Sequence, residues 1–409
     1  ANIPDPKDPA FPSDEEFFAQ WPRFRGPDGS GHSPHPDPPL EWDATSGKNI
    51  VWKVPVPLPG NSSPIVWDDR VFVTGADESR REVFCFDATS GKLLWSSELP
   101  GTPDSTAEPP EVMEDTGFAA PTPVTDGRRV FAVFANGDVG AFDYAGNVLW
   151  SHSLGIPDNA YGHASSLAMY HDLVIVQFDQ GSPDDDKSRL IAYKAATGEV
   201  AWEVERPVAN SWTTPLVVFD HDPPMLVTDA DPYVIAYNVQ DGSELWRLEG
   251  TTGDCGPSAV YADGVVYVGN EYSYLFAIPT DKSGELTEDD ALWVGDEGLP
   301  DLCSPLIVDD MVIVVAYGAL TAYDAAGGEV LWTFEFDDAD FASSPSLADG
   351  RLYLFDKEGK SFVLEADREG AKIVSEPVLG EPCVTSPAFQ PGRLYIRGAE
   401  HLFCIGAPE

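Results

Sequence analysis

Short runs of β-branched and aromatic residues, separated by polar turns, follow one another along the whole chain. Residues 62–74 read SSPIVWDDRVFVT, in which two apolar runs flank the pair Asp68-Asp69, and Asp126-Gly127 occupies the same place in a later segment. An acidic residue with glycine between two apolar runs is typical of a tight β-hairpin, because the turn needs residues that tolerate positive φ. The pattern therefore predicts an all-β chain of short antiparallel strands.

A phrase of about ten residues closes each repeat of this pattern. It reads WDATSGKNIVW over residues 42–52 and FDATSGKLLW over residues 86–95, and altered copies follow. Strand-rich repeats with a period of about 40 to 50 residues indicate a propeller or another repeat array. We expect the tryptophans of this phrase to be structural and buried between blades, because one recurring position fits packing better than seven binding sites. They are Trp52, Trp95, Trp150, Trp202, Trp246, Trp293 and Trp332.

A phrase of three mostly small residues, usually ending in proline, opens each repeat. Small side chains suit the crowded axis where inner strands converge, and proline suits the first residue of a strand. The phrase has two interpretations, a ring of hydroxyls lining a central tunnel or simple steric packing. Its eight copies predict an eight-bladed β-propeller of four-stranded antiparallel blades. They lie at residues 62–64, 121–123, 165–167, 213–215, 255–257, 303–305, 343–345 and 385–387.

The two ends of the chain complete one another. The last repeat stops after a third strand at residues 401–405, whereas residues 49–54 form a lone strand near the N-terminus. We expect residues 49–54 to be the outer strand of the last blade, beside the strand that contains Cys404, because a closed ring has no free sheet edge. The domain prediction is a Pro-rich arm over residues 1–40 and a single propeller over residues 41–409.

The charge of the chain limits its partners. It has 69 acidic and 24 basic residues, a formal net charge of −45, which argues against electrostatic binding to nucleic acid or anionic membranes. No run of 18 apolar residues is present, so we expect no transmembrane segment. The chain begins at Ala1 without a signal-peptide pattern, as a mature exported protein or a trimmed piece would. We expect a periplasmic or secreted monomer.

Several groups of acidic residues are candidates for Ca²⁺, which prefers several oxygen ligands. They are residues 184–186, Asp229 with Asp231, and residues 337–340. None has the spacing of an EF-hand loop, and an acidic, solvated surface is the alternative interpretation. The five cysteines are an odd number, and we expect buried free thiols.

The phrase D-A-x-x-G-x-x-x-W resembles the docking motif of the PQQ-type eight-bladed propellers, in which its tryptophan packs between neighbouring blades. That superfamily includes the quinoprotein alcohol dehydrogenases and the non-catalytic outer-membrane assembly factors of the BamB type. The segment WPRFRGPDGSG at residues 21–31 is similar to the opening of many exported PQQ-like repeat proteins. The resemblance covers about residues 20–409 and implies the fold far more specifically than the function.

The chain departs from the dehydrogenases at the cofactor site. The resemblance implies adjacent cysteines over PQQ and a metal held by Glu, Asn and Asp, but the sequence has no Cys-Cys pair and that set of ligands has no matching positions. It also lacks the G-x-S-x-G, P-loop and H-E-x-x-H motifs. We therefore predict no catalytic residues and no cofactor, with PQQ disfavoured and calcium left open.

Two functions remain, and both use the face that carries the long loops, at residues 75–82, 100–118, 156–163, 179–189, 229–233 and 269–274. The first is an exported, non-enzymatic propeller that scaffolds a protein or binds a small polar ligand, for example a saccharide, because variable loops on a rigid scaffold often carry recognition. The alternative is a small-molecule enzyme, a PQQ-type oxidoreductase or a lyase, with its active site at the channel mouth.

Five polar or aromatic residues near the start of the repeats form the candidate binding site. They are Asn61, His163, Trp212, Asp254 and Asp301, and each stands three or four residues before the proline of an opening phrase or its equivalent. These positions should surround the channel mouth on the long-loop face. An amide, an imidazole, an aromatic ring and two carboxylates that converge there would suit a polar ligand. The alternative is that each is solvated alone or caps a loop.

Overall fold

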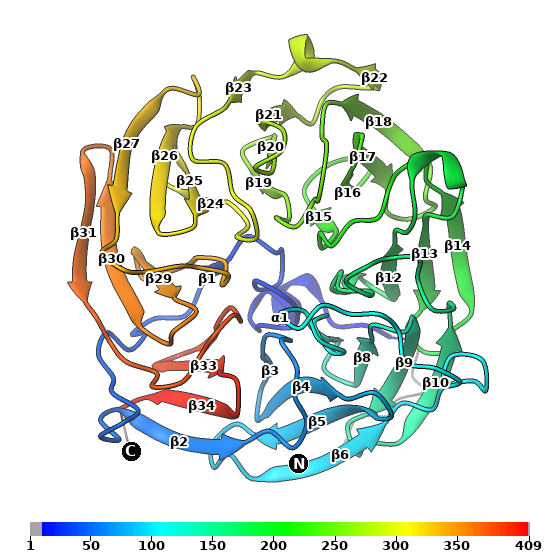
Figure 1. The fold of residues 1–409 in the computed structure, drawn as a ribbon, viewed down its shortest axis with the longest axis vertical. Helices are drawn as coiled ribbons and strands as arrows, with labels where there is room; N and C mark the ends of the chain where they lie inside the picture. Colours follow the sequence, from blue (N-terminus) through cyan, green and yellow to red (C-terminus); the bar gives the residue numbers. More distant parts are fainter. Residues whose placement is uncertain (1–9, 408–409) are drawn as a thin grey trace.

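Eight β-sheets surround a central axis, which confirms the predicted all-β, eight-bladed propeller (Figure 1). The computed structural model describes residues 10–407, so residues 1–9 of the predicted arm and residues 408–409 lie outside it. Every blade contains four antiparallel strands, and each innermost strand has only two or three residues. Among the described residues, no helix is long and apolar enough to cross a membrane.

The strands of the first four complete blades follow chain order. They are β3 (Ile65–Trp67), β4 (Arg70–Ala76), β5 (Arg81–Asp87) and β6 (Leu93–Glu98); β7 (Val124–Thr125), β8 (Arg129–Val133), β9 (Asp138–Asp143) and β10 (Val148–Ser153); β11 (Ala168–Tyr170), β12 (Leu173–Phe178), β13 (Arg189–Lys194) and β14 (Val200–Glu205); and β15 (Leu216–Val218), β16 (Met225–Ala230), β17 (Tyr233–Asn238) and β18 (Glu244–Glu249).

The next three blades have the same order, and two short strands extend the sheets. These blades contain β19 (Val260–Ala262), β20 (Val265–Val268), β21 (Leu275–Pro279) and β23 (Trp293–Gly295); β24 (Leu306–Val308), β25 (Met311–Ala316), β26 (Ala319–Asp324) and β27 (Val330–Glu335); and β28 (Ser346–Ala348), β29 (Arg351–Phe355), β30 (Ser361–Asp367) and β31 (Gly370–Ser375). Strand β1 (His32–Ser33) pairs in parallel with β28, and β22 (Gly284–Leu286) pairs in parallel with β18.

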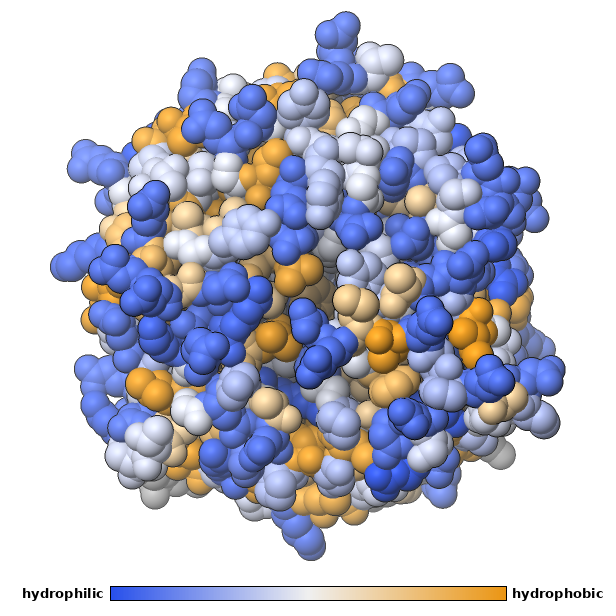
Figure 2. Space-filling view, viewed as in Figure 1, coloured by the Kyte–Doolittle hydropathy of each residue, from blue (hydrophilic) through white to orange (hydrophobic). Residues whose placement is uncertain are grey.

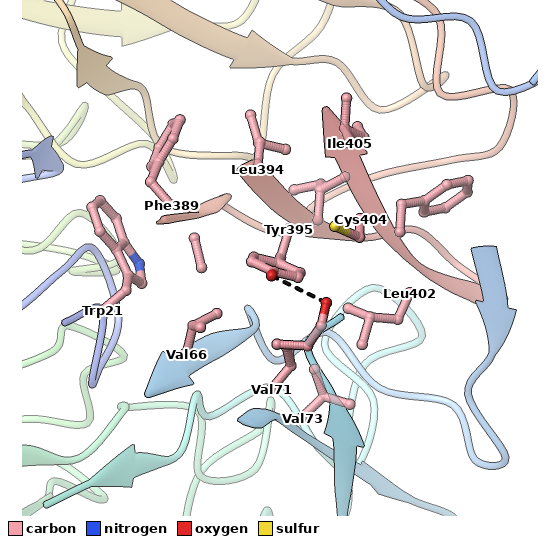
Figure 3. Packing of buried hydrophobic residues seen from close by; sticks show 14 of the residues in the cluster. Trp21, Val66, Val71, Val73, Phe389, Leu394, Tyr395, Leu402, Cys404 and Ile405 are labelled. Atoms are coloured by element: carbon pink, nitrogen blue, oxygen red, sulfur yellow. Dashed lines mark hydrogen bonds between the residues drawn. The ribbon is translucent and has the colours of Figure 1, made fainter. Parts of the chain in front are cut away.

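The last blade joins the two ends of the chain, as predicted. Its inner strands are β32 (Ala388–Gln390), β33 (Arg393–Arg397) and β34 (His401–Gly406), and its outer strand is β2 (Ile50–Pro55). Strands β2 and β34 are antiparallel, with Trp52 opposite Cys404. In Figure 1, β2 lies beside β34 at the rim of the ring. Tyr395 in this blade donates a hydrogen bond of 3.2 Å to the carbonyl of Ala88 in the next blade (Figure 3).

The tryptophans of the repeated phrase lie at the boundaries between blades. Trp52 donates its indole N–H to the carbonyl of Ala88 in the next blade, and five others make the equivalent bond, at 2.7–3.1 Å. Trp246 is fully buried and its Nε1 has no acceptor within residues 10–407. Trp95 and Trp332 are partly buried, and the others are buried. Six of the seven indoles thus donate to a carbonyl of the neighbouring blade, where a hydrogen bond and a flat apolar surface are both available.

The arm crosses the face that carries the tight turns between first and second strands. Its helix α1 (Asp14–Phe18) begins with a capping box of Ser13 and Glu16. Trp21 is buried, forms a β-bridge with Val66 and packs edge-on against Phe389, with ring centroids 5.2 Å apart (Figure 3). The arm is therefore packed on the propeller from residue 10 onward. All five cysteines are buried and free, as expected.

Candidate functional site

A channel of about 120 Å³ runs along the axis and opens on the long-loop face. Figure 2 shows the molecule in the same view as Figure 1, with a hollow at its centre bordered by hydrophobic and polar residues. The channel wall has an upper level at the mouth and a lower level of hydroxyl groups. The upper level contains Asn61, Ala120, Ala164, Trp212, Gly256, Leu302, Ala342 and Val384.

The lower level is a closed ring of eight hydroxyl side chains, one from each blade. The backbone N–H of each ring residue donates to the hydroxyl oxygen of the ring residue in the next blade, at 2.8–3.2 Å, and Ser386 closes the circle by donating to Ser63. This ring joins all eight inner strands, so the small residues of the opening phrase supply hydrogen bonds as well as space. The ring residues are Ser63, Thr122, Ser166, Thr214, Ser258, Ser304, Ser344 and Ser386.

The N-terminal arm closes the channel at its far end. Phe24 lines the channel, and its two neighbours in sequence fix the arm to the inner strands. Arg23 donates to the carbonyl of Pro215 at 2.8 Å, and Arg25 donates to that of Pro305 at 2.7 Å. The carbonyl of Pro22 accepts the N–H of Thr125. The channel is therefore a blind cup with Phe24 at its base.

In seven blades the residue at the upper level of the wall is the one predicted to lie at the channel mouth. In the remaining blade another residue takes that place. Asp254 was expected there from its distance to Pro257, but Gly256 lines the channel instead. The reason is a shift of register, because Ser258 and not the residue before Pro257 supplies the ring hydroxyl of this blade. Asp254 consequently stands two residues farther out and is exposed.

Two of the five candidate residues line the channel. Asn61 donates hydrogen bonds from its side-chain amide to the carbonyls of Asp115 and Thr116, at 2.6 and 3.2 Å. Trp212 donates its indole N–H to Asn159 Oδ1 at 3.1 Å. Both side chains are therefore held by the long loops above them, and both are partly exposed to the channel.

Asp254 and Asp301 lie at the rim, within one group of aromatic and acidic side chains from connections between β10 and β26. Tyr161 links two of its members: its ring packs edge-on against Trp212 at 4.7 Å, and its hydroxyl donates to Asp254 at 3.4 Å. Tyr317 donates to Glu271 at 2.5 Å. We call this group the rim cluster, and it comprises Tyr161, Trp212, Asp254, Glu271, Tyr272, Asp301 and Tyr317.

The carboxylates of the rim cluster repel one another. Burial raises the pKa of Asp301, and the charges of Glu271 and Asp254 raise it further. The hydrogen bond to Glu271 raises the pKa of Tyr317 to about 12. Within residues 10–407, Asp254, Glu271 and Asp301 form no ion pair; Lys357 acts on Asp301 but pairs with Asp340 at 2.8 Å. The rim cluster thus concentrates negative charge, and no basic residue among the described ones forms an ion pair with its three carboxylates.

His163 does not line the channel. It is 3% exposed, its ring lies 5.5 Å from that of Phe178, and its Nε2 has no partner in the described part of the chain. Burial lowers the pKa of His163 to about 4, so the imidazole is neutral at pH 7. It stands one residue before Ala164 in the sequence, and the side chain turns away from the axis at that position.

The sequence did not identify Tyr161, Glu271, Tyr272 or Tyr317. Tyr272 and Tyr317 are more than half exposed, and exposed tyrosines in loops have no periodicity to mark them. Tyr317 lies in the short β25–β26 turn, outside the long loops named from the sequence. The long loops at residues 156–163 and 269–274 were the available signals, because the first carries Tyr161 and the second carries Glu271 and Tyr272.

The candidate metal and cofactor sites fit poorly. Nowhere in residues 10–407 do three His, Cys, Asp or Glu side chains stand close enough to share one metal ion. Asp229 is fully buried with both oxygens unpartnered among those residues, and burial raises its pKa to about 7. PQQ is a three-ring tricarboxylate, whereas the cup is smaller than the roughly 300–1,000 Å³ of pockets for ligands of that size. Its rim would also repel three carboxylates, so the residues present do not fit PQQ.

Comparisons with solved structures support the fold. BamB from Moraxella catarrhalis is 15% identical, with a TM-score of 0.63 over 87% of this chain and 99% of that one. A europium-containing methanol dehydrogenase is 10% identical, with a TM-score of 0.71 over 98% and 99%. The quinohemoprotein alcohol dehydrogenase from Comamonas testosteroni is 12% identical, with a TM-score of 0.68 over 95% and 80%. At these identities the likeness concerns the fold alone.

Comparison at the level of sequence families is more specific. No curated protein matches the sequence. The family model described as outer membrane protein assembly factor BamB matches residues 41–203, 182–292 and 288–373, which together make up most of the propeller. The chain belongs to this family of BamB-like PQQ-type propellers.

Proposed function

We propose that this protein is a non-enzymatic binding module that takes a cationic group of a protein partner on its long-loop face, at the rim cluster. One observation carries the proposal: Asp254, Glu271 and Asp301 share one side of the channel mouth with four aromatic rings and have no ion pair with a basic residue in the described chain. Carboxylates and ring faces both attract ammonium and guanidinium groups.

The asymmetry of the mouth favours a specific contact over a general effect of charge. The rest of the channel wall at the mouth presents Asn61, Ala120, Ala164, Ala342 and Val384, none of them charged. A neutral saccharide could stack on the same rings but would leave the three carboxylates unpaired. A lysine or arginine side chain uses both kinds of group, and the blind cup beneath the rim has room for a neighbouring side chain.

The test compares two variants with the same change in net charge. Asp254→Asn/Glu271→Gln/Asp301→Asn removes the rim charges, and Glu285→Gln/Glu288→Gln/Asp289→Asn removes three exposed charges at the outer edge of the ring. A capped lysine-rich peptide is titrated calorimetrically at about 0.3 M salt, where long-range charge effects are screened. We expect binding to the rim variant to be about tenfold weaker or more, and binding to the edge variant to match the native protein.

Equal weakening in the two variants would show that the peptide responds only to the overall negative charge, and it would overturn the proposal. Trp212→Ala is a second variant for the same titration, because it leaves the net charge unchanged and removes the aromatic surface. A variant that binds the peptide as well as the native protein would remove Trp212 from the site.

We also propose that the protein is exported, in keeping with the description of its family as an outer membrane assembly factor. Fractionation of the source cells tests this directly. Recovery in the cytosolic fraction with a cytosolic marker would contradict it.

A further inference from the structure

The ring hydroxyls at the bottom of the cup have protons to donate. Each hydroxyl oxygen already accepts one backbone N–H from the neighbouring blade. The hydroxyl of Ser386 donates to the carbonyl of Ser344 at 3.3 Å. For the other seven, no protein group within residues 10–407 accepts the proton. A hydroxyl whose acceptor role is filled can still donate one hydrogen bond, so the lower wall of the channel is rich in donors.

Two buried arginines lie next to this ring without a counter-ion. Arg23 and Arg25 are each 1% exposed, and the Nε and Nη1 atoms of both have no acceptor in the described residues. Arg23 donates to the carbonyl of Pro215, and Arg25 donates to those of Pro305, Pro345 and Ser30. The three prolines directly follow the ring residues Thr214, Ser304 and Ser344. Both guanidinium groups therefore lie close to the level of the ring.

Two other buried arginines in this protein have a carboxylate partner, whereas the buried Arg397 donates only to the Ser62 hydroxyl and to the carbonyls of Thr74 and Leu58. Arg129 pairs with Asp126, and Arg206 pairs with Asp179, all with side chains that are fully buried. Asp28 influences Arg23 and Arg25 but forms no ion pair with either. Burial lowers the pKa of both arginines to about 10, so both carry a positive charge at pH 7. An unpaired buried charge is costly, and a bound ion of opposite sign offsets that cost.

We propose that the base of the axial channel is a binding site for a small anion, a halide or a compact oxyanion, held by the ring hydroxyls in the field of Arg23 and Arg25. The anion would rest above Phe24, at the end of the channel away from the rim carboxylates. A cavity of about 120 Å³ accommodates such an ion with a few waters, since a cavity holds one water from about 10–15 Å³ upward. The site is separate from the rim cluster, and its ligand has the opposite charge.

Bromide is the probe, because it is compact and gives an anomalous X-ray signal. Crystals of the native protein grown in sodium bromide should show an anomalous peak on the axis, between the hydroxyl ring and Phe24. Peaks confined to the outer surface, or an axial position filled only by water, would overturn the proposal. This measurement does not depend on any variant folding correctly.

Solution measurements use adjacent serines as a matched pair. Ser344 contributes a ring hydroxyl, whereas Ser343 is buried beside it and does not line the channel. The melting temperature of each protein is followed as bromide replaces gluconate at constant ionic strength, because a ligand of the native state raises it in a saturable way. We expect the dissociation constant for bromide to be about threefold to tenfold higher in Ser344→Ala and unchanged in Ser343→Ala.

A melting temperature that does not rise with bromide in the native protein, or that responds equally in both serine variants, would contradict the proposal. Sulfate in place of bromide distinguishes an oxyanion site from a halide site. A saturable effect with either ion and loss of that effect in Ser344→Ala support the site and identify its preferred ligand.

Discussion

Gly91 packs against the indole of Trp52 so closely that a Cβ atom on Gly91 would lie 2.7 Å from the ring. Four other glycines, Gly146, Gly198, Gly242 and Gly328, meet the tryptophan of the preceding blade in the same way, at 2.6–2.9 Å. Gly91 also has a φ of +70°, which residues with a side chain rarely adopt. The glycine and the tryptophan of the repeated phrase therefore form one contact between neighbouring blades.

The first prediction separates the contact from the backbone strain. Gly91→Ala should lower the free energy of unfolding more than Gly47→Ala, because Gly47 has a similar φ of +80° but no atom within 4 Å of its Cβ position. We expect Gly47→Ala to lower the free energy of unfolding by about 1 kcal/mol, from backbone strain alone. Gly91→Ala should lower it by a further 1–3 kcal/mol, roughly, because the added Cβ also meets Trp52. Urea denaturation of both variants measures the difference, and equal losses would contradict the prediction.

The second prediction concerns the burial of the phrase tryptophans. Trp246→Ala should cost about 3–5 kcal/mol, as large aromatic truncations in a core do, because Trp246 is fully buried. Trp332→Ala should cost less, since Trp332 is only partly buried. Denaturant midpoints give the ranking. A smaller loss at Trp246 than at Trp332 would show that burial does not control the contribution of these residues.

The third prediction concerns pH. Burial is the main cause that raises the pKa of Asp229 to about 7, with Asp179 adding to it and Thr251 and Arg206 opposing it. An acid whose pKa is raised by folding destabilises the native state as the pH rises from about 4 to about 7, with no further change above that. Asp229→Asn removes the ionisation, so its stability relative to the native protein should increase between pH 4 and pH 8.

Thermal denaturation of the two proteins at both pH values tests this prediction. A constant difference would mean that Asp229 does not titrate differently in the folded state. A difference that becomes smaller toward pH 8 would mean that the carboxylate form is stabilised in the folded protein.

The fourth prediction concerns the cofactor. Protein mixed with PQQ and Ca²⁺ should show no dye-linked alcohol oxidation, because the cup is small, the rim is acidic and no three ligating side chains of the described chain stand together. A spectrophotometric dye assay, with and without a chelator, provides the measurement. Activity that appears with PQQ and disappears on chelation would place a redox site in this propeller.

The sequence predicted the features that repeat and missed those that do not. The number of blades and the closure by residues 49–54 followed from the repeated phrases, because each blade needs the same turn and the same contact. Asp254 was misplaced because Ser258, beyond the proline used as a reference, supplies the ring hydroxyl. Tyr161, Glu271, Tyr272 and Tyr317 come together from three separate loops, and their proximity depends on loop paths that no periodicity encodes.

The pairing of β2 with β34 has a consequence for how the protein is made. The two strands are separated by some 350 residues of chain, so the last blade cannot assemble until residues 401–406 have left the ribosome. Until then the inner edge of β2 is a row of unpaired backbone groups, available to other chains. Contacts at such long range also make folding slow. A circular permutant that joins the present termini and opens the loop at residues 103–116 would shorten the separation between β34 and β2 from some 350 to about 50 residues of chain, and it should refold faster and aggregate less.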